Sequence, residues 1–457
     1  IVTMTLREIK KSTGKVIDVE QLPFEKEVFE NIFATGKTGS VFQFESPGMK
    51  KMLKSFKPDC FEDLVALVSL YRPGPMEFIP QYIEAKFHPE TISYLCPQLE
   101  PILSKTYGCI VYQEQVMEIV QKLAGFSLSQ ADNVRRFMSK KKMDKLEHER
   151  EAFVHGEKER GIDGCTSRGI SVKVANQLFD QMIEFAKYAF NKSHAAAYAA
   201  LSYITAYLKY HYPAEYMCSV LNCTDNAKKM PSVLGDCREI GIEVLPPDIN
   251  SSDIGFVVKE NKILFGLNSI KGTKIAAVRT ILEDRKANGE YISFKDFLKR
   301  KVGDKSTCEG LIFAGAMDAF HPNRYAMLRT YEVGSELVGK IKDKEEDLLL
   351  KEEKLKENPE EKRTITAYQK AKDALELLKQ QFEILRIIDG AEDKKQRMLK
   401  EKEVLGFFVT SHPMESFRLP EQMGCVSISN LEPGSISVEI IGIIENLEIK
   451  GRKKDNK

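Results

Sequence analysis

Apolar residues recur at helical spacing through the first half of this chain. Residues three, four and seven positions apart fall on one face of an α-helix, and an apolar stripe on such a face is buried against a core. The clearest examples are Phe61, Leu64, Val65 and Val68, and then Val116, Ile119, Val120 and Leu123. Pro213 and the polar stretch Asn222–Lys229 end the pattern. The spacing therefore predicts one mainly helical domain over residues 1–224.

The next segment, residues 225–335, follows a different pattern. Two short apolar runs, Phe256–Lys259 and Lys262–Leu267, flank the polar pair Glu260-Asn261, which is typical of a β-hairpin. Two small helical units follow, one around Ile270-Lys271-Gly272 and one around Leu311–Ala316. A glycine between short helices exposes backbone N–H groups to a phosphate, as in helix-hairpin-helix elements that bind duplex DNA. From this motif alone, an ordinary helix C-cap glycine is the favoured alternative.

Alternating charges dominate the sequence from Lys340 to Lys402, as in KEEDLLLKEEKLKE. Because opposite charges four residues apart stabilise an exposed helix, we expect a charged helical arm or hairpin over residues 336–402. Gly434–Glu448 then shows the pattern of strands, and residues 403–457 are expected to begin a β domain that the chain leaves incomplete. The predicted fold is multidomain and mainly α, with a small β-hairpin and an incomplete C-terminal β segment.

Length and charge limit the classes of protein that fit. A chain of 457 residues exceeds one hydrophobic core, so roughly two to four domains are expected. The formal net charge is +1, so a nucleic-acid surface has to be a local basic patch. The nine cysteines form no CxxC pair, which argues against a zinc ribbon or disulfide framework and for a reducing cytoplasm. No apolar run is long enough to span a bilayer.

A basic cluster lies in the segment ADNVRRFMSKKKMDKLEHER. Its members are Arg135, Arg136, Lys140, Lys141 and Lys142. If one helix runs through the segment, Arg135, Ser139 and Lys142 share a face, as do Arg136 and Lys140. A solvated helix face is the alternative, and it is the better choice for a lysine-rich run. The double arginine between apolar neighbours favours phosphate binding, because a guanidinium suits phosphate oxygens in partly buried places.

The stretch FAKYAFNKSHAAAY places polar groups beside small residues. Helical spacing puts Asn191, His194 and Tyr198 on one face, with Lys192 about 100° away. A lone histidine is most often a structural hydrogen-bonder, but the alanines let another backbone or a nucleotide approach closely. His194 and Lys192 are therefore candidates for binding a triphosphate. No cysteine or carboxylate at ligand spacing surrounds His194, so no metal site is expected there.

Three further segments carry weaker signals. Arg72-Pro73-Gly74-Pro75 fixes a stiff turn, in which Arg72 either points into a groove or forms a corner between helices. Tyr112–Gln115 opens an amphipathic helix whose polar start either touches DNA or caps the helix. Gly36-Lys37-Thr38 is similar to the end of a P-loop, but Asn31 stands where the first glycine is needed. A surface turn is therefore favoured for that segment.

Longer segments carry a resemblance to a known family. They include VFQFESPGMKKMLK, YGCIVYQEQVMEI, NVRRFMSKKK, FAKYAFNKSHAAAYA, LPPDIN, FGLNSIKG and EVLGFFVTSHPM. The chain resembles the alpha-subunit family of bacterial DNA polymerase III over nearly its whole length except the charged arm. The resemblance implies polymerase fingers, then a tandem helix-hairpin-helix element, then the start of an OB-fold. The family's palm, with its metal-binding aspartates, would precede Ile1, so we expect a truncated chain without catalytic carboxylates.

The resemblance also assigns residues. Nucleotide contacts are implied for Arg135, Arg136, Lys192 and His194, to which we add Asn191 and Arg72. DNA contacts are expected for Lys140, Lys141, Lys142, Lys271, Gly272 and Lys274. The chain departs from the family at Ala189, where glycine is usual, and at Thr273-Lys274, where valine-glycine is usual. No clamp-binding peptide is recognisable near the arm, and Gln380-Gln381-Phe382 is a poor match.

The resemblance implies part of a DNA-directed DNA polymerase, a nucleotidyltransferase of chromosomal replication. Mg²⁺ would be held by the palm of the full enzyme, and this portion alone is expected to be inactive. The expected partners are primer-template DNA, dNTP, the sliding clamp and other replisome subunits, in the bacterial cytoplasm and without a membrane. Two alternatives remain: a stand-alone, non-catalytic DNA-binding protein, and a scaffold whose Lys340–Lys402 arm binds a protein partner.

Overall fold

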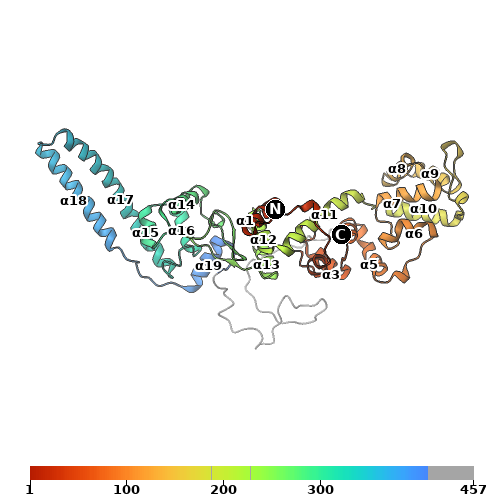
Figure 1. Ribbon diagram of the computed structural model, residues 1–457, viewed down its shortest axis with the longest axis horizontal. Helices are drawn as coiled ribbons and strands as arrows, with labels where there is room; N and C mark the ends of the chain where they lie inside the picture. The colour runs from red at the N-terminus through yellow and green to blue at the C-terminus, as the bar shows by residue number, and fades with distance from the viewer. Residues whose placement is uncertain (141, 187, 227, 410–457) are drawn as a thin grey trace, which may run out of the picture. The chain divides into compact units, whose positions relative to one another are not determined.

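The computed structural model describes residues 1–140, 142–186, 188–226 and 228–409 (Figure 1). These residues form two compact units. The first comprises Ile1–Cys223 and Gly235–Ile242, and the second comprises Thr224–Leu234 and the described residues from Glu243 onward. The mainly helical fold predicted from the sequence is confirmed. The strands expected within Gly434–Glu448 lie outside the described residues.

The first unit consists of α-helices joined by turns, short 3-10 segments and the π-helical segment Phe29–Phe33, which continues α2. In chain order they are α1 (Val2–Thr13), α2 (Lys26–Val28), α3 (Pro47–Phe56), α4 (Phe61–Leu70), α5 (Ile79–Phe87), α6 (Glu100–Leu103), α7 (Gln113–Ala124), α8 (Leu128–Ser139), α9 (Met143–His155), α10 (Val172–Ala186), α11 (Lys192–His211) and α12 (Pro213–Asn222). The next helix, α13 (Met230–Glu239), contains residues of both units. No described helix has both the length and the apolar composition that a bilayer span requires.

Two hydrophobic cores hold the first unit together. One gathers apolar residues of α6 to α10, and it includes Val116, Ile119 and Leu123. The other includes Leu64 and Val65 of α4 together with residues of α11. Both apolar stripes predicted from the sequence are therefore confirmed as core faces. These two cores fix the positions of α8, which carries Arg135 and Arg136, and of α11, which carries Lys192 and His194.

The alanines of α11 belong to the second core. Ala195 and Ala199 are fully buried, and α11 packs against α4. Small side chains at a helix contact reduce the distance between the two backbones. The close approach that the sequence predicted for these alanines is thus made by α4, and these two positions are closed to a nucleotide.

Side-chain caps fix the helix ends nearest the predicted site. Ser127 Oγ accepts a hydrogen bond from Gln130 N at 3.3 Å, and Gln130 Oε1 accepts one from Ser127 N at 2.7 Å. This capping box starts α8. Asn191 Oδ1 accepts from His194 N at 2.8 Å and starts α11 in the same way. Helix α7 ends at Gly125, whose φ of 81° suits a glycine C-cap.

A buried lysine of α11 closes the turn that follows α2. Lys209 Nζ donates to the carbonyl oxygens of Lys37 at 2.8 Å and Gly39 at 2.7 Å. Burial lowers the pKa of Lys209 to about 8. Thr38, which is fully buried, donates to the Phe44 carbonyl at 2.6 Å. Gly36-Lys37-Thr38 is therefore a turn, as predicted, but it is packed against α11 instead of lying on the surface.

The second unit combines a small sheet with α-helices. The strands are β1 (Val244–Leu245), β2 (Val257–Lys259) and β3 (Lys262–Leu264), in the sheet order β1-β3-β2. The helices are α14 (Ile275–Asn288), α15 (Phe294–Arg300), α16 (Lys305–Phe313), α17 (Arg324–Glu357), α18 (Lys362–Ile384) and α19 (Lys394–Leu405).

The predicted β-hairpin is confirmed. Strands β2 and β3 pair antiparallel, with Lys259 opposite Lys262. Glu260 and Asn261 between them have φ values of 50° and 60°, as a two-residue type I′ turn requires. Strand β1, which pairs parallel to β3, was not predicted, because two residues are too few to show alternation.

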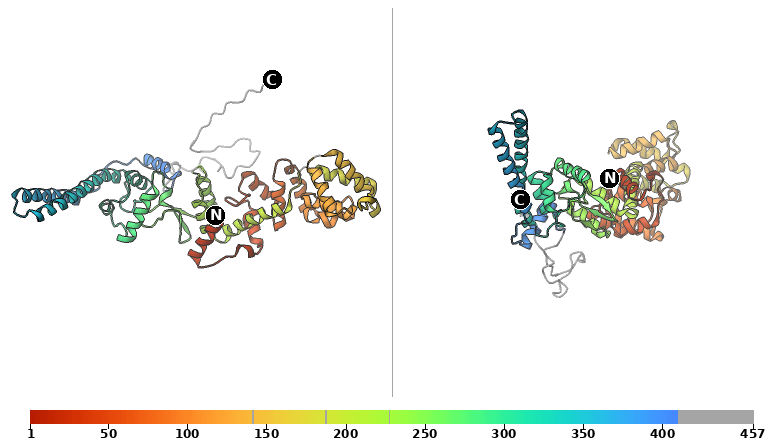
Figure 2. Two further views of the ribbon diagram at one scale, coloured as in Figure 1. Left: turned by 90° about the horizontal axis from the view of Figure 1, so that it is seen from above. Right: turned by 60° about the vertical axis from the view of Figure 1, so that its left-hand side comes forward.

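Helices α17 and α18 lie side by side as a helical hairpin (Figure 1, Figure 2). Lys379 of α18 pairs with Glu345 of α17 at 2.7 Å, and pairs four residues apart, such as Lys351 with Asp347 at 2.8 Å, run along α17. The charge pattern thus correctly predicted a helical hairpin. After Ile384 the structure differs from the predicted arm, because α19 packs against α16.

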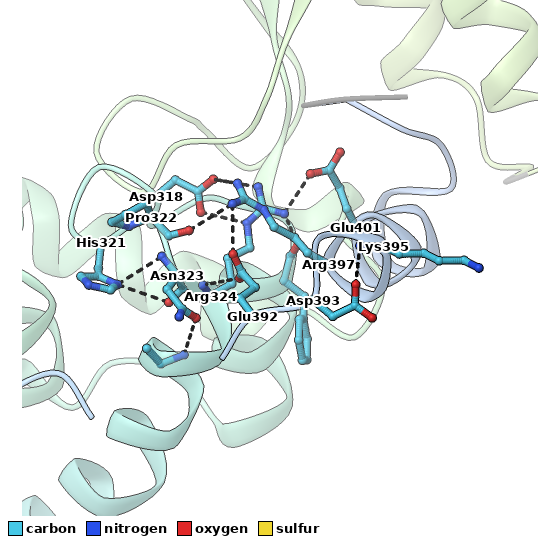
Figure 3. A network of polar contacts seen from close by, with 12 residues as sticks. Asp318, His321, Pro322, Asn323, Arg324, Glu392, Asp393, Lys395, Arg397 and Glu401 are labelled. Atoms are coloured by element: carbon cyan, nitrogen blue, oxygen red, sulfur yellow. Dashed lines mark hydrogen bonds and ion pairs between the residues drawn. The ribbon is translucent and has the colours of Figure 1, made fainter. Parts of the chain in front are cut away.

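A polar network joins the start of α17 to α19 (Figure 3). Arg324 binds both carboxylate oxygens of Asp318, at 2.9 and 2.7 Å. The same guanidinium donates to Glu401 at 2.8 Å and to the Phe313 carbonyl at 2.9 Å. Arg397 of α19 adds a bond to Asp318 at 3.2 Å. Asp318 and Glu401 each face a guanidinium, which is the condition under which charges are tolerated in an interior.

Candidate nucleotide-binding site

The two arginines predicted to contact phosphate share one carboxylate. Arg135 binds Asp132 Oδ1 through Nε at 2.8 Å and Nη2 at 2.6 Å, and Arg136 Nε lies 2.8 Å from Asp132 Oδ2. The hydrogen bond from Arg135 and the charges of both arginines lower the pKa of Asp132. The Arg135 side chain is 24% exposed, whereas that of Arg136 is 59% exposed. Arg135 is therefore the more rigidly held of the two.

Gln113 connects Arg135 to the segment that leads into α11. Its Oε1 accepts a hydrogen bond from Arg135 Nη1 at 3.2 Å, and its Nε2 donates to the Ala189 carbonyl at 3.1 Å. The Gln113 backbone N–H also donates to the Phe190 carbonyl at 3.0 Å. Through these contacts the double-arginine segment and the FNKSH segment, which are distant in the sequence, meet in the fold.

Glu114 lies at the N-terminus of α11. Its carboxylate accepts hydrogen bonds from Lys192 N at 3.1 and 3.0 Å and from Asn191 Nδ2 at 3.0 Å. The N-terminus of a helix carries a partial positive charge and favours an anion. In this structure a carboxylate of the chain itself satisfies that preference. Tyr112–Gln115, predicted either to touch DNA or to cap a helix, thus includes a residue that caps a second helix.

His194 and Tyr198 lie on one face of α11, as predicted, whereas Asn191 precedes the helix as its N-cap. His194 is exposed and contacts the ring of Tyr198 with centroids 4.5 Å apart and that of Phe190 at 5.5 Å. Lys192 points elsewhere, with its Nζ 5.3 Å from the centre of the Tyr112 ring. His194 and Lys192 are thus presented in different directions, and both are accessible.

Arg72 forms the corner that was one of its two expected roles. It donates to the Ser69 carbonyl at 2.8 Å and to the Tyr188 carbonyl at 2.7 Å. Its guanidinium lies 4.2 Å from the centre of the Phe190 ring, and burial lowers the pKa of Arg72. Arg72 therefore braces the segment before α11, and a nucleotide contact by this side chain remains a prediction.

The lysines after the arginines are not on one continuous helix, so the predicted shared face of Arg135, Ser139 and Lys142 is wrong. Helix α8 ends at Ser139, Lys140 is its C-cap, and Lys142 precedes α9. The Lys142 N–H donates to the Phe137 carbonyl at 3.1 Å, which turns the chain. Lys140 and Lys142 are both exposed, and Lys141 lies outside the described residues.

A pocket of about 270 Å³ opens beside Glu114. Its charged lining residues are Glu62, Lys105, Glu114, Glu118 and Lys192. Three carboxylates against two ammonium groups repel a polyphosphate. A triphosphate is therefore better matched by the side of the site that carries Arg135 and Arg136.

The first helical hairpin of the second unit contains Lys271, Gly272 and Lys274. Gly272 has a φ of 94°, a conformation that favours glycine, and its carbonyl accepts from Ser306 Oγ at 2.9 Å. Lys271 is exposed. Lys274 pairs with Asp304 at 2.8 Å, and its N–H donates to Thr307 Oγ1 at 3.2 Å. Gly272 is thus a turn residue between two helical segments, and Lys271 carries the less compensated charge.

A second hairpin is formed by α16 and the start of α17. Gly315 between them has a φ of 84°, and a Cβ at this position would collide with the Arg324 guanidinium. The turn therefore requires glycine for two reasons, conformation and space. Two glycine turns followed by helices, at Gly272 and Gly315, agree with the tandem element predicted from the sequence.

Comparison with known proteins finds a finger domain and a helix-hairpin-helix motif in the segments that contain Arg135 and Gly272. Residues 1–161 match the family model of the bacterial DNA polymerase III alpha subunit finger domain, and residues 241–327 match a helix-hairpin-helix motif. A DNA polymerase III subunit alpha from Neisseria meningitidis serogroup B is 38% identical over 97% of this chain. The chain is similar to bacterial DNA polymerase III alpha subunits over nearly its whole length.

Two other DNA polymerase III alpha subunits are similar to this chain at nearly the same level of identity. The protein from Thermus aquaticus is 38% identical over 96% of this chain, and that from Chlamydia pneumoniae is 36% identical over 100%. The chain spans only 36% of the length of the Neisseria protein and 35% of the other two. The matched finger domain contains Arg135 and Arg136, whereas Asn191, Lys192 and His194 lie between the two matched segments.

Two carboxylates and a thiol form a cluster in the first unit. Asp59, Cys60 and Asp63 lie close enough to share an ion. Lys86 Nζ is bonded to Asp63 and lies 3.4 Å from Asp59, so an ammonium group already compensates these carboxylates. Burial raises the pKa of the Cys60 thiol to about 11, which keeps it protonated. This group does not fit the two Mg²⁺ ions of a polymerase.

Asp132 was not identified from the sequence, and Gln113 was named only within Tyr112–Gln115, without a role in holding Arg135. Asp132 precedes the arginines by three and four positions, a spacing that brings side chains together on a helix, so it was available as a signal. Gln113 had no such signal, because its partners are 22 and 76 positions away. Its place in the site follows from the packing of α7 against α8.

Proposed function

We propose that this chain is the part of a replicative DNA-directed DNA polymerase that binds the incoming dNTP and the primer-template. The observation that carries the proposal is the meeting of Arg135 with the N-terminus of α11 through Gln113 and Glu114. Two guanidinium groups and the half-buried Lys192 outnumber the carboxylates of Asp132 and Glu114 in this region, which leaves a net positive charge for a phosphate. The similarity to DNA polymerase III alpha subunits supports the same activity.

The described residues act by position and charge in this proposal. Arg135 is fixed by Asp132 before any ligand arrives, so little conformational entropy is lost when a phosphate binds. Arg136, which is more exposed, adjusts to the ligand. Charge placed in advance stabilises the transition state of phosphoryl transfer. Mg²⁺ bound to the full enzyme would supply activation of the 3′ oxygen, with ligands from outside the residues described.

DNA binding is proposed for the exposed lysines of both units. Lys140 and Lys142 follow the phosphate-binding arginines, and Lys271 lies in the first hairpin. Backbone phosphates attract such groups without regard to sequence. A sliding clamp, other replisome subunits and a place in the bacterial cytoplasm are proposed from the family alone. Phe382 is buried, and Lys295 lies 5.5 Å from its ring centre, so Gln380-Gln381-Phe382 is poorly suited to bind a clamp.

The test is steady-state kinetics of the complete polymerase with Arg135→Ala or Arg136→Ala. Loss of a charged hydrogen bond is expected to lower kcat/KM for dNTP about tenfold to a hundredfold. Arg7→Ala is the control, since Arg7 is an exposed residue of α1, and it should match the native enzyme. Unchanged kinetics in both site variants would reject the proposed role.

A non-catalytic DNA-binding function is the second candidate, and the helix-hairpin-helix match favours it. It predicts duplex binding that falls steeply with salt and is indifferent to dNTP. Duplex binding that tightens when the complementary dNTP is added would decide for the polymerase role.

A further inference from the structure

Three consecutive residues contact both halves of the candidate site. Tyr112 contacts Lys192, Gln113 contacts Arg135, and Glu114 contacts the N-terminus of α11. The arginines come from α8 and the other groups from α11, and the cores hold these two helices separately. The contacts of Tyr112–Glu114 therefore connect the arginines of α8 to the first turn of α11.

Capping of α7 does not explain these contacts. Gln115 performs that task, because its Oε1 accepts hydrogen bonds from Val111 N at 2.8 Å and from Tyr112 N at 3.0 Å. The side chains of Gln113 and Glu114 point instead to residues of other elements. Since these side chains bind no backbone group of α7, every residue of which the structure describes, they do not cap the first turn of that helix.

The chemistry of Gln113 suits a positioning role. An amide can donate and accept at once, and Gln113 does both, accepting from Arg135 and donating to Ala189. It orients the guanidinium without adding a second negative charge. Asp132 already compensates the two arginines, so a carboxylate at position 113 would remove the excess positive charge that a phosphate needs.

Glu114 completes the link on the other side. Its carboxylate holds Lys192 N and Asn191 Nδ2, and Asn191 in turn caps the N–H of His194 at 2.8 Å. The direction in which Lys192 and His194 leave α11 thus depends on Glu114. The charge of Glu114 also strengthens its bonds to the helix N-terminus.

We infer that Gln113 and Glu114 are positioning residues that hold Arg135 and the first turn of α11 in one arrangement for a triphosphate. This inference rests on the proposed nucleotide-binding function. Neither residue has to touch the ligand, since Gln113 acts through Arg135 and Glu114 acts through Asn191, which caps the N–H of His194.

The experiment uses the complete polymerase with Gln113→Ala, Glu114→Gln, Arg135→Ala and the double variant Gln113→Ala/Arg135→Ala. KM for dNTP, KM for primer-template and kcat are measured separately. Gln113→Ala and Glu114→Gln should each raise the dNTP KM about tenfold and leave the primer-template KM unchanged. Gln177→Ala and Glu184→Gln, matched changes at exposed positions of α10, should behave as the native enzyme does.

The double variant separates positioning from independent binding. If Gln113 acts through Arg135, the double variant has the same dNTP KM as Arg135→Ala alone, because removing Arg135 leaves nothing to orient. Effects that multiply would overturn the inference for Gln113. Native dNTP KM in both Gln113→Ala and Glu114→Gln would overturn it entirely.

Failure of the inference is distinguishable from failure of the proposed function. If Arg135→Ala itself keeps native kinetics, the nucleotide-binding proposal fails. If Arg135→Ala is impaired and Gln113→Ala is not, only the positioning role of Gln113 fails. A thermal unfolding temperature is measured for each variant, and a rise in the primer-template KM parallel to that in the dNTP KM would assign Gln113 a general structural role and overturn the inference.

Discussion

Arg324 and Glu401 form an ion pair of 2.8 Å in which neither side chain is more than 1% exposed. The pair joins α17 to α19, across 77 positions of the sequence. Glu401 also accepts the Val409 N–H at 2.7 Å. The segment after the arm is thereby fastened to the helix from which the arm departs.

Removing one partner of this ion pair should destabilise the second unit strongly. Glu401→Ala leaves the Arg324 charge buried with incomplete compensation, which costs about 3–5 kcal/mol in comparable cases. Hydrogen exchange of the α19 amides measures the loss. Glu403→Ala, which breaks the exposed pair with Lys400, should cost less than about 1 kcal/mol. Equal exchange in the two variants would contradict the prediction.

Lys209 should make stability depend on pH in the alkaline range. Its folded pKa of about 8 lies below the ordinary value of 10.5, so the unfolded chain holds the proton more tightly. The free energy of unfolding should therefore rise from pH 8 to 10.5, by at most about 3 kcal/mol at about 1.4 kcal/mol per pKa unit.

The measurement is urea unfolding at several pH values, for the native protein and for Lys209→Met. Other groups titrate in the same range, so the informative quantity is the difference between the two proteins. The native protein should gain stability relative to Lys209→Met as the pH rises. A constant difference would show that Lys209 keeps an ordinary pKa in the folded state.

Asp304 should weaken duplex binding, because its carboxylate pairs with Lys274 at 2.8 Å. Asp304→Asn keeps an N-cap for α16, since asparagine caps as well as aspartate, and it frees the charge of Lys274. Binding to duplex DNA should tighten, and the salt dependence should steepen by up to about 0.9 in the logarithmic slope. Fluorescence anisotropy at several salt concentrations measures both quantities.

Asp343→Asn is the matched control, the same change of charge on an exposed position of the arm. It should leave the salt slope unaltered. If both variants bind DNA equally, Lys274 takes no part in the interface.

Shortening the arm should leave the rest of the second unit folded. The residues that fasten the chain beyond the arm, such as Thr330 to Ile388 at 2.8 Å and Asn323 to Gly390 at 2.7 Å, lie outside its distal part. Replacing residues 346–378 by a short glycine-serine linker should preserve protection of the α14 and α19 amides in hydrogen exchange. Loss of that protection would show that the arm is part of the core.

The sequence predicted those features that depend on neighbouring residues. The apolar stripe at Val116, Ile119 and Leu123 and the turn at Glu260-Asn261 are local patterns, and both were correct. The charged hairpin was predicted for the same reason. The break between α8 and α9 was missed, because nothing in SKKKMDK stops a helix by composition alone.

Contacts between distant segments were beyond prediction. Lys209 reaches the carbonyl of Gly39 across 170 positions, and Gln113 reaches Ala189 across 76. A lysine or glutamine in a helical pattern is usually a solvated surface residue, so neither position was distinguishable from its neighbours. Only the packing of the helices assigns these two side chains their partners.

The helical hairpin of α17 and α18 provides a site at which the protein can be labelled or immobilised. Helix α17 has 34 residues, which corresponds to about 51 Å at 1.5 Å per residue. The connection from Asn358 to Glu361 is exposed and lies at the far end of that length from Arg324. A fluorophore, a cross-linker or a surface-immobilisation tag placed there would report on the protein from a point far from the first turn of α17.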